Sequence, residues 1–209
     1  MTFSQKNQKK VNKISTLYAS LNPVYNNFDE FLKKLSPKRQ ERILAMKDFD
    51  ARVNSLGGAL LLNEAAKRFG VDADSVCYTK DGKPYVNDCD FHFSISHSKG
   101  YAVCSFGKIP SGCDIQLKQN ANLKIAARLF SPKEQQKVFS SKNPEDEFFK
   151  VWCRKESSFK LIGNTYCTEE NSQGLHFKEY TVLENLHLVV CAYENMFNNP
   201  ERLNLNIAF

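Results

Sequence analysis

The chain has 209 residues, of which 42% are hydrophobic and 25% charged, the composition of an ordinary soluble protein with one large domain or two small ones. Its net charge of +6 favours an anionic ligand or partner, without choosing between a nucleotide, a nucleic acid and an acidic protein. No apolar run is long enough to span a membrane, and the basic N-terminus lacks the apolar core of a signal peptide. We therefore expect a cytoplasmic protein with no membrane partner.

The first half of the chain predicts a long helical region over residues 36–69. Ser36-Pro37 is a typical helix start, and Gly70 is a suitable stop. Apolar residues recur between them at helical spacing. Gly57-Gly58 in the middle indicates a bend or a close contact.

Short strands are predicted next. SVCYTK and KPYV flank a turn at Asp81-Gly82, and FHFSIS, YAVCSF and GCDIQ follow. In FHFSIS the side chains of Phe91, Phe93 and Ile95 share one face, because alternate residues of a strand point the same way.

The second half predicts helices first and strands second. NLKIAARLF and SPKEQQKVFSS are helical, and the clearest helix begins at Pro144 and ends at Gly163. GLHFKEYTVL and LHLVVCAYE are typical of strands, and ERLNLNIAF of a short strand or tail. YAVCSF resembles LVVCAY, which suggests two similar α+β halves with a ligand cleft between them. Chance similarity of two apolar strands explains the likeness of these two segments equally well.

The seven cysteines indicate reduced thiols. No two form a CxxC pair, an odd number cannot all pair within the chain, and several lie in apolar runs. A zinc site is disfavoured without closely spaced pairs of ligands.

One candidate cluster of hard oxygen ligands is visible. Asp114 and Gln116 lie two apart in a predicted strand and so share a face, while Glu156 lies on the clearest helix. Two carboxylates and an amide suit Mg²⁺. Spacing alone favours solvated polar side chains instead. Lys155 precedes Glu156, and Lys160 follows it by one helical turn, as an ordinary ion-pair partner or as a phosphate contact.

Basic side chains form a second candidate group. Lys38, Arg39 and Arg42 share one helical turn, and Arg52 follows. Each alone is a typical solvated residue, but a set could clamp a phosphate. His97, after Ser96 at a strand end, is an ordinary loop histidine or a phosphate contact. Lys83-Pro84 adds a cation at a loop edge.

Taken in order, six segments resemble the motifs of the Sfp-type 4′-phosphopantetheinyl transferases. They are SPKRQER, GKP, FSISHS, GCDIQ, RLFSPKE and FFKVWCRKESSFK, at residues 36–42, 82–84, 93–98, 112–116, 128–134 and 148–160. The element from Trp152 to Ser157, with S-x-S-H and G-x-D before it, is specific in this order.

The resemblance implies an α+β pseudo-dimer of two similar halves, each a small antiparallel sheet packed on a long helix. Residues 1–112 would carry the nucleotide and 3′-phosphate contacts, and residues 113–209 the metal and the catalytic helix. It also implies a Mg²⁺-dependent reaction. The phosphopantetheine arm of coenzyme A would pass to a serine of an apo acyl or peptidyl carrier protein, releasing adenosine 3′,5′-bisphosphate. We expect a monomer.

The same resemblance implies roles for individual residues. Asp114 and Glu156 would be the main metal ligands, with Gln116 between them, and Glu156 or a water that it orients would be the base. Lys160, with Lys155 as a second cation, would stabilise the pyrophosphate. The coenzyme A contacts implied are Arg39, Arg42, Arg52, Lys83, Pro84, Ser96 and His97.

Two positions depart from the family pattern. Gln116 stands where the common ligand is Glu, and Asn54 stands where the family usually has Arg, with Arg52 two residues earlier. An alternative is therefore a catalytically weakened relative that binds coenzyme A or a carrier protein without efficient transfer. A basic nucleic-acid-binding domain is disfavoured, because the charge is spread out and the aromatic residues lie on apolar stripes.

Overall fold

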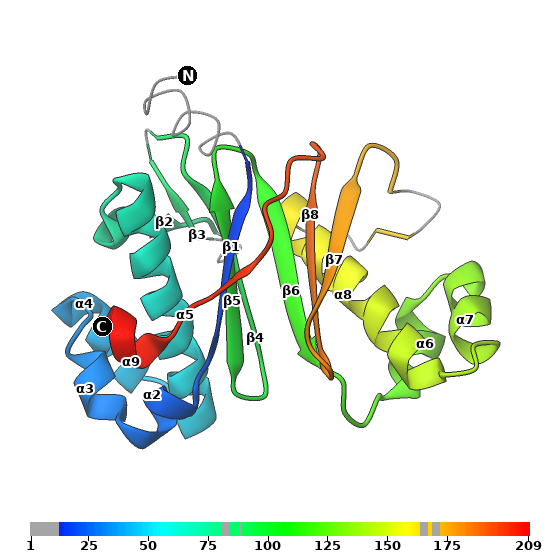
Figure 1. The fold of residues 1–209 in the computed structure, drawn as a ribbon, viewed down its shortest axis with the longest axis horizontal. Helices are drawn as coiled ribbons and strands as arrows, with labels where there is room; N and C mark the ends of the chain where they lie inside the picture. Colours follow the sequence, from blue (N-terminus) through cyan, green and yellow to red (C-terminus); the bar gives the residue numbers. More distant parts are fainter. Residues whose placement is uncertain (1–12, 81–83, 88, 164–166, 169–171) are drawn as a thin grey trace.

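The computed structural model describes residues 13–80, 84–87, 89–163, 167–168 and 172–209 and gives the chain an α+β fold (Figure 1). The predicted long helical region forms two helices, α4 (Pro37–Leu44) and α5 (Phe49–Phe69). They are separate because the Asp48 side chain accepts a hydrogen bond from the Ala51 N–H and so caps a new helix. Gly70 ends α5 in a left-handed conformation, as predicted.

A four-stranded sheet packs against α5. Its strands are, in spatial order, β4 (His92–Ser98), β5 (Tyr101–Gly107), β1 (Ser15–Ser20) and β9 (Glu201–Arg202). Neighbours are antiparallel except β1 and β9, which are parallel. Leu56, Leu60 and Leu61 of α5 are fully buried between helix and sheet. Each such side chain contributes about 1.5–3 kcal/mol by leaving water.

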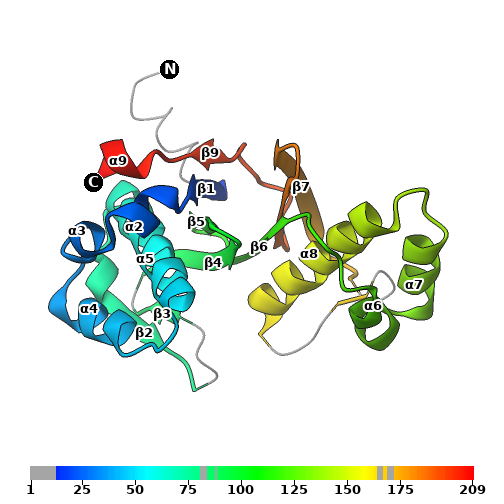
Figure 2. The same ribbon diagram turned by 90° about the horizontal axis from the view of Figure 1, so that it is seen from below.

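A second, three-stranded sheet packs against the other long helix, α8 (Pro144–Ile162). Its strands are β6 (Ser111–Leu117), β8 (Leu186–Ala192) and β7 (His176–Leu183), all antiparallel, with β8 in the middle. The face turned away from α8 packs on Tyr18 and Val103 of the first sheet. The two sheets therefore lie between the two long helices (Figure 2).

Smaller elements complete the fold. Among them are helices α6 (Leu123–Leu129) and α7 (Pro132–Phe139), which lie beside the first half of α8, and the antiparallel strands β2 (Val76–Tyr78) and β3 (Pro84–Val86). The turn predicted between β2 and β3 lies outside the described residues. The remaining short elements are α2 (Asn22–Asn26), α3 (Phe28–Leu32), the 3₁₀ turn η1 (Ala73–Ser75) and α9 (Leu205–Ala208).

The equivalence of two halves stays a prediction. β5 and β8, which carry the echoed segments, are each flanked by two strands and packed on a long helix. However, the chain crosses back at its end, because β9 pairs with β1 and Leu203 joins the core beneath α5. A division at residue 112 would also fall inside β6. The division into domains is likewise a prediction.

Side-chain hydroxyls join the two sheets where the backbone does not. Among the described strands, β4 and β6 share no ladder of paired residues. Instead, Ser94 Oγ accepts a hydrogen bond from the Cys113 N–H at 3.1 Å, and Ser98 Oγ accepts one from the Leu117 N–H at 3.2 Å. These bonds satisfy two backbone N–H groups of β6 that have no carbonyl partner on β4.

The seven cysteines, all within the described residues, are free thiols, and five of them are buried. The predicted reduced state is the one the structure contains. Within the described part of the chain, no helix has the length and apolarity needed to cross a bilayer.

Two glycine positions allow close packing of the long helices. Gly58 of α5 lies against Ile95 of β4, so the pair Gly57-Gly58 marks a close contact, one of its two predicted roles. Gly112 of β6 is more constrained. A Cβ there would lie 1.9 Å from the Ser157 carbonyl oxygen and 2.7 Å from the Leu161 nitrogen of α8. Backbone therefore packs on backbone at this point.

We predict that Gly112→Ala lowers the free energy of unfolding by about 1–3 kcal/mol, because α8 must move away from β6 to admit the methyl group. Denaturant unfolding measures the change. Gly58→Ala is the matched control. Its methyl group meets only the end of Ile95, at 3.0 Å, and alanine gains about 1 kcal/mol of helix propensity, so its stability should change little. Equal effects of the two variants would contradict the close approach.

Candidate active site

β4 separates the predicted site residues into two groups. Phe93, Ile95 and His97 line a pocket beneath α5. The alternate residues Ser96 and Ser98 point to the opposite face, toward β6. One strand therefore connects a pocket on one side with a polar cluster on the other.

Asp114 is the centre of the polar cluster. Its side chain is only 2% exposed. Its Oδ1 accepts hydrogen bonds from Ser96 Oγ and from Lys160 Nζ, both at 2.7 Å, and its Oδ2 accepts one from Gln116 Nε2 at 3.1 Å. A buried carboxylate is stable only with such partners, and each of the three comes from a different element, β4, α8 and β6.

Lys160 carries the positive charge of the cluster. Burial alone would lower the pKa of its ammonium, but the Asp114 carboxylate, aided by Glu156, raises that pKa above its ordinary value. Lys160 is therefore charged at neutral pH. Its side chain as a whole remains 26% exposed. Glu156 lies one turn earlier on α8 and is partly buried.

Gln116 presents its amide nitrogen, not its oxygen, to Asp114. Its Oε1 accepts a hydrogen bond from Ser98 Oγ at 3.3 Å. If the amide turned over, Oε1 would lie beside Asp114, and Nε2 could donate to the Ser98 hydroxyl, which has a second lone pair. The donor set of Asp114, Gln116 and Glu156 consists of oxygen ligands of the kind that Mg²⁺ prefers. Within the described residues there is no cluster of three His, Cys, Asp or Glu side chains suited to a metal.

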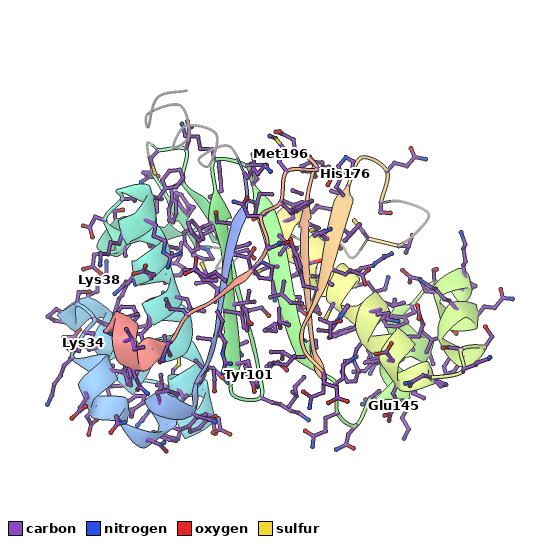
Figure 3. All side chains as sticks on the ribbon, in the orientation of Figure 1. Lys34, Lys38, Tyr101, Glu145, His176 and Met196 are labelled. Atoms are coloured by element: carbon purple, nitrogen blue, oxygen red, sulfur yellow. The ribbon has the colours of Figure 1, made fainter. Side chains whose placement is uncertain are left out.

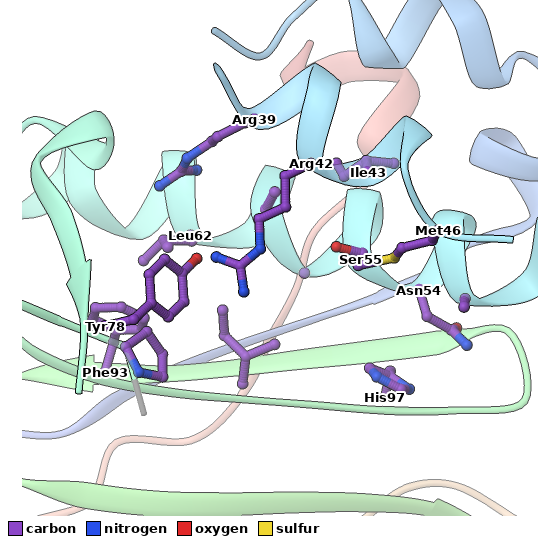
Figure 4. Close-up of a pocket in the computed structure, with 15 residues that line it drawn as sticks. Arg39, Arg42, Ile43, Met46, Asn54, Ser55, Leu62, Tyr78, Phe93 and His97 are labelled. Atoms are coloured by element: carbon purple, nitrogen blue, oxygen red, sulfur yellow. The ribbon is translucent and has the colours of Figure 1, made fainter. Parts of the chain in front are cut away.

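The pocket on the other side of β4 has a volume of about 380 Å³ (Figure 4). Its walls are mainly apolar, with basic and aromatic groups at the rim. The Arg42 guanidinium lies 3.9 Å from the centre of the Tyr78 ring. Four of the predicted coenzyme A contacts line this pocket: Arg39, Arg42, Pro84 and His97.

Arg39 is held by acceptors of the protein. It donates to Asn63 Oδ1 at 2.9 Å and to the Ala73 carbonyl, and its Nε lies 3.3 Å from Asp74 Oδ1. Lys38, on the same turn, is exposed and points outward (Figure 3). The three basic residues of this turn therefore differ in their surroundings.

Ser96 and Arg52, two of the predicted contacts, are placed outside the pocket. Ser96 faces Asp114 and not the pocket. Arg52 donates to the Met46 carbonyl at 2.7 Å and is absent from the pocket lining, where Asn54 and Ser55 stand instead. Lys83 lies outside the described residues.

Lys155 belongs to a different environment from Lys160. It is 1% exposed, and its Nζ lies 2.9 Å from Glu134 Oε2 and donates to the Cys167 carbonyl at 3.1 Å. Glu134 also completes the capping box of α7 with Ser131. The Lys155 ammonium thus joins α7 to α8, and its buried ion pair with Glu134 holds it within the protein.

Some lining residues were missed by the sequence analysis. Tyr78 and Ser55 line the pocket, and Ser98 fixes Gln116. The position of Ser98 beside the cluster could have been predicted from the sequence. Ser94, Ser96 and Ser98 alternate in one strand and must therefore share a face. No local pattern indicates Tyr78, whose place depends on the pairing of β2 with β3.

His97 is an exposed residue at the edge of the pocket. The partial desolvation of its ring lowers the pKa of the imidazole, the nearby Lys160 ammonium lowers it further, and the Asp114 carboxylate opposes both. A histidine whose pKa lies below its ordinary value is neutral at pH 7.

We predict that Lys160→Met raises the pKa of His97, because the variant removes a repelling charge and leaves the attracting Asp114. The titration of the His97 ring protons by NMR measures it. Lys118→Met is the control: it should raise the pKa of His187, which Lys118 lowers, and leave His97 unchanged. A fall in the His97 pKa in Lys160→Met would show that the cluster is not arranged as described.

Comparison with known proteins gives consistent matches. A family model described as the 4′-phosphopantetheinyl transferase superfamily matches residues 110–196, which include Asp114, Gln116, Glu156 and Lys160. A "4′-phosphopantetheinyl transferase" of Bacillus subtilis is 33% identical over 136 residues, 62% of this chain and 60% of the relative.

Two further relatives agree. The "4′-phosphopantetheinyl transferase Sfp" of Bacillus subtilis strain 168 is 30% identical over 65% of this chain and 63% of the relative. The "4′-phosphopantetheinyl transferase gsp" of Aneurinibacillus migulanus is 31% identical over 65% of this chain and 59% of the relative. The chain thus spans about three fifths of the length of these relatives. The matches confirm the resemblance indicated by the motifs: the chain is related to the Sfp-type 4′-phosphopantetheinyl transferases.

Proposed function

We propose that this protein transfers the 4′-phosphopantetheine arm of coenzyme A to a serine of an apo acyl or peptidyl carrier protein and releases adenosine 3′,5′-bisphosphate. The observation that carries the proposal is the placement of two sites on opposite faces of one strand. His97 lines a pocket with basic and aromatic groups, and the adjacent Ser96 binds the Asp114 carboxylate beside Lys160. Coenzyme A has a nucleotide for the first site and a pyrophosphate for the second.

The pocket would hold the nucleotide. Its apolar walls suit a base, and Tyr78 and Pro84 offer flat surfaces at its rim. Arg39 and Arg42, with His97, would face the 3′-phosphate. Arg52 is not included, because its guanidinium is bound to the Met46 carbonyl.

Asp114 and Glu156 would hold a magnesium ion, with Gln116 as a third ligand through its oxygen. A Mg²⁺ ion held by these residues would supply positive charge for the pyrophosphate oxygens of the leaving group. Two features support the fit. The cluster contains hard oxygen donors, and a flip of the Gln116 side-chain amide would bring its oxygen beside Asp114. Two carboxylates leave room for phosphate oxygens and water in the coordination shell.

The chain's own residues would supply the remaining chemistry. Glu156, or a water that it orients, takes the proton of the carrier serine. The serine oxygen then forms a bond to the phosphorus nearer the pantetheine arm, the bond from that phosphorus to the bridging oxygen breaks, and the electron pair leaves with adenosine 3′,5′-bisphosphate. Lys160 stabilises the charge on the pyrophosphate, since its side chain is exposed in part and its ammonium is charged at neutral pH. Ser96 holds Asp114 in place.

The proposal also covers the binding partners, the oligomeric state and the location of the enzyme. The net charge of +6 suits both coenzyme A and an acidic carrier protein. A pseudo-dimer of two halves, each with a sheet and a long helix, would complete the site within one chain, so we propose a monomer. We also propose that it works in the cytoplasm, where coenzyme A would meet its carrier.

We predict that the protein adds the mass of one phosphopantetheine group to an apo carrier in the presence of coenzyme A and Mg²⁺, as measured by mass spectrometry. Asp114→Ala and Glu156→Ala should each lower the rate by at least about a hundredfold, because they remove a metal ligand or the base. Glu184→Ala is the control, since Glu184 lies exposed in the turn between β7 and β8.

The absence of a mass gain on carriers of fatty acid, polyketide and nonribosomal peptide type would overturn the proposal. If coenzyme A then still bound in calorimetry, the result would support the alternative of a binding protein without efficient transfer. Gln116 and its amide nitrogen directed at Asp114 are the observations that favour this alternative.

Gln116→Glu tests the metal site directly. We predict that the variant keeps its activity and that the half-saturating Mg²⁺ concentration falls about tenfold, because one more carboxylate faces the cation. Activity titrations and the Mg²⁺-dependent shift in melting temperature measure the change. An inactive but folded Gln116→Glu variant would show that residue 116 does not face the metal.

A further inference from the structure

The turn between β4 and β5 holds a lysine in a backbone conformation that lysine disfavours. The turn consists of Lys99 and Gly100, and both have positive φ, 41° and 82°. Ser98 and Tyr101 pair on either side of it. Two-residue hairpin turns of type I′ require positive φ at both positions and favour Asn-Gly or Gly-Gly there. Gly100 suits its position, but a residue with a Cβ atom is strained at the first, and such strain is found most often at functional positions.

The rest of the turn is fixed to its surroundings. The Gly100 carbonyl accepts a hydrogen bond from the Leu21 N–H at 2.7 Å. Ser98 Oγ accepts one from the Leu117 N–H at 3.2 Å. Tyr101 marks the place of the turn at one end of the sheets (Figure 3). The Lys99 side chain therefore projects from a backbone that is anchored to β6 on one side and to the residue after β1 on the other.

The ammonium of Lys99 lies on the side of β4 where the Asp114 cluster is. Its Nζ donates to Gln119 Oε1 at 3.3 Å, and Gln119 is three residues beyond Gln116, at most about 10 Å along the chain. Lys99 is not among the described residues that line the pocket beneath α5. Its side chain is exposed, and no carboxylate of the described residues pairs with it. The charge is therefore available to a ligand.

The carrier protein is the substrate that such a charge fits. In the proposed function, coenzyme A fills the pocket and reaches the Asp114 cluster, so the carrier must bring its serine to Glu156 over the surface that remains around this cluster. A standard protein interface covers about 800 Å² per partner, which extends about 16 Å from its centre. An interface of this size centred on the cluster reaches Lys99. An acidic carrier would supply a carboxylate for the ammonium.

We propose, on the basis of the proposed function, that Lys99 is a docking contact for an acidic side chain near the modified serine of the carrier protein. The contact lies at the rim of the interface, because Lys99 is exposed and stands beside the cluster and not within it. A rim charge acts on the association of two proteins and on its salt dependence, and it leaves the bonds made and broken at phosphorus unchanged. The contact accounts for a lysine where the turn favours asparagine.

Lys99→Asn separates the contact from the turn. Asparagine tolerates the left-handed conformation, so the melting temperature should rise by about 2–4 °C. The KM for the carrier should nevertheless rise about fourfold at low ionic strength, because an exposed ion pair is lost. The KM for coenzyme A and the half-saturating Mg²⁺ concentration should stay unchanged. An unchanged carrier KM, or a rise in the coenzyme A KM in its place, would overturn the proposal.

Two variants serve as controls. Lys99→Arg keeps the charge and should keep the carrier KM. Lys108→Asn removes the same charge at an exposed position beyond the other end of β5, and it should also leave the carrier KM unchanged. A rise in carrier KM in Lys108→Asn equal to that in Lys99→Asn would show that net charge alone matters, and the specific contact would be wrong.

Salt and an exchange of charges test the pairing itself. The carrier KM should rise with KCl concentration, and it should rise less in Lys99→Asn, because screening acts on a charge that this variant lacks. Lys99→Glu should weaken carrier binding about tenfold, and changing one acidic residue near the carrier serine to lysine should restore it. Failure of every such carrier variant to restore binding would contradict the proposed pairing.

The failure of this proposal is distinguishable from that of the proposed function. Transfer to the carrier with a KM that does not depend on the charge of residue 99 would overturn the docking contact alone. No transfer to any carrier would overturn the proposed function. Calorimetric binding of the apo carrier without coenzyme A then still decides the docking contact. Equal affinities of the unaltered protein and Lys99→Asn, or no binding by either, would overturn it, and weaker binding by Lys99→Asn would support it.

Discussion

The buried carboxylate of Asp114 is the constraint on which the rest of the structure depends. A charge that is 98% removed from solvent must be compensated within the protein, and the compensation comes from a hydroxyl on β4, an ammonium on α8 and an amide on β6. The same contacts that stabilise the charge therefore bring the two sheets and the second long helix together. The absence of a side chain at Gly112 allows α8 to come close enough for Lys160 to reach Asp114.

β4 connects this cluster to the pocket beneath α5. Consecutive residues of a strand point to opposite faces, so Ser96 and His97 serve different sites although they are neighbours in sequence. Lys160 also influences both sites, since it binds Asp114 and lowers the pKa of His97. The pocket and the cluster are thus coupled by charge as well as by the backbone.

Much of the fold could be predicted from local signals. Ser-Pro starts, Gly stops and acidic first turns located α4, α7 and α8, because helix ends depend on residues close in sequence. β1 was not predicted, since the segment STLYAS becomes a strand only by filling the space between β5 and β9. The break before α5 depended on Asp48, a single capping residue within a continuous apolar pattern.

The sequence predicted which residues belong to the candidate site better than it predicted how they are arranged. Spacing placed Asp114 and Gln116 on one face, and the structure has them in contact. The separate environments of Lys155 and Lys160 could not be read in the same way, because they depend on where α7 packs. The same holds for Arg52, which a backbone carbonyl holds outside the pocket.

The edge position of β4 has a consequence for the shape of any molecule that uses both sites. The pocket and the Asp114 cluster lie on opposite faces of this strand, and β4 is the outermost strand of its sheet. A ligand that touches both must therefore curve around the strand and bind in a folded conformation. Flexible diphosphate linkages permit such a curve. Analogues with a rigid, extended linker would reach one site or the other, but not both.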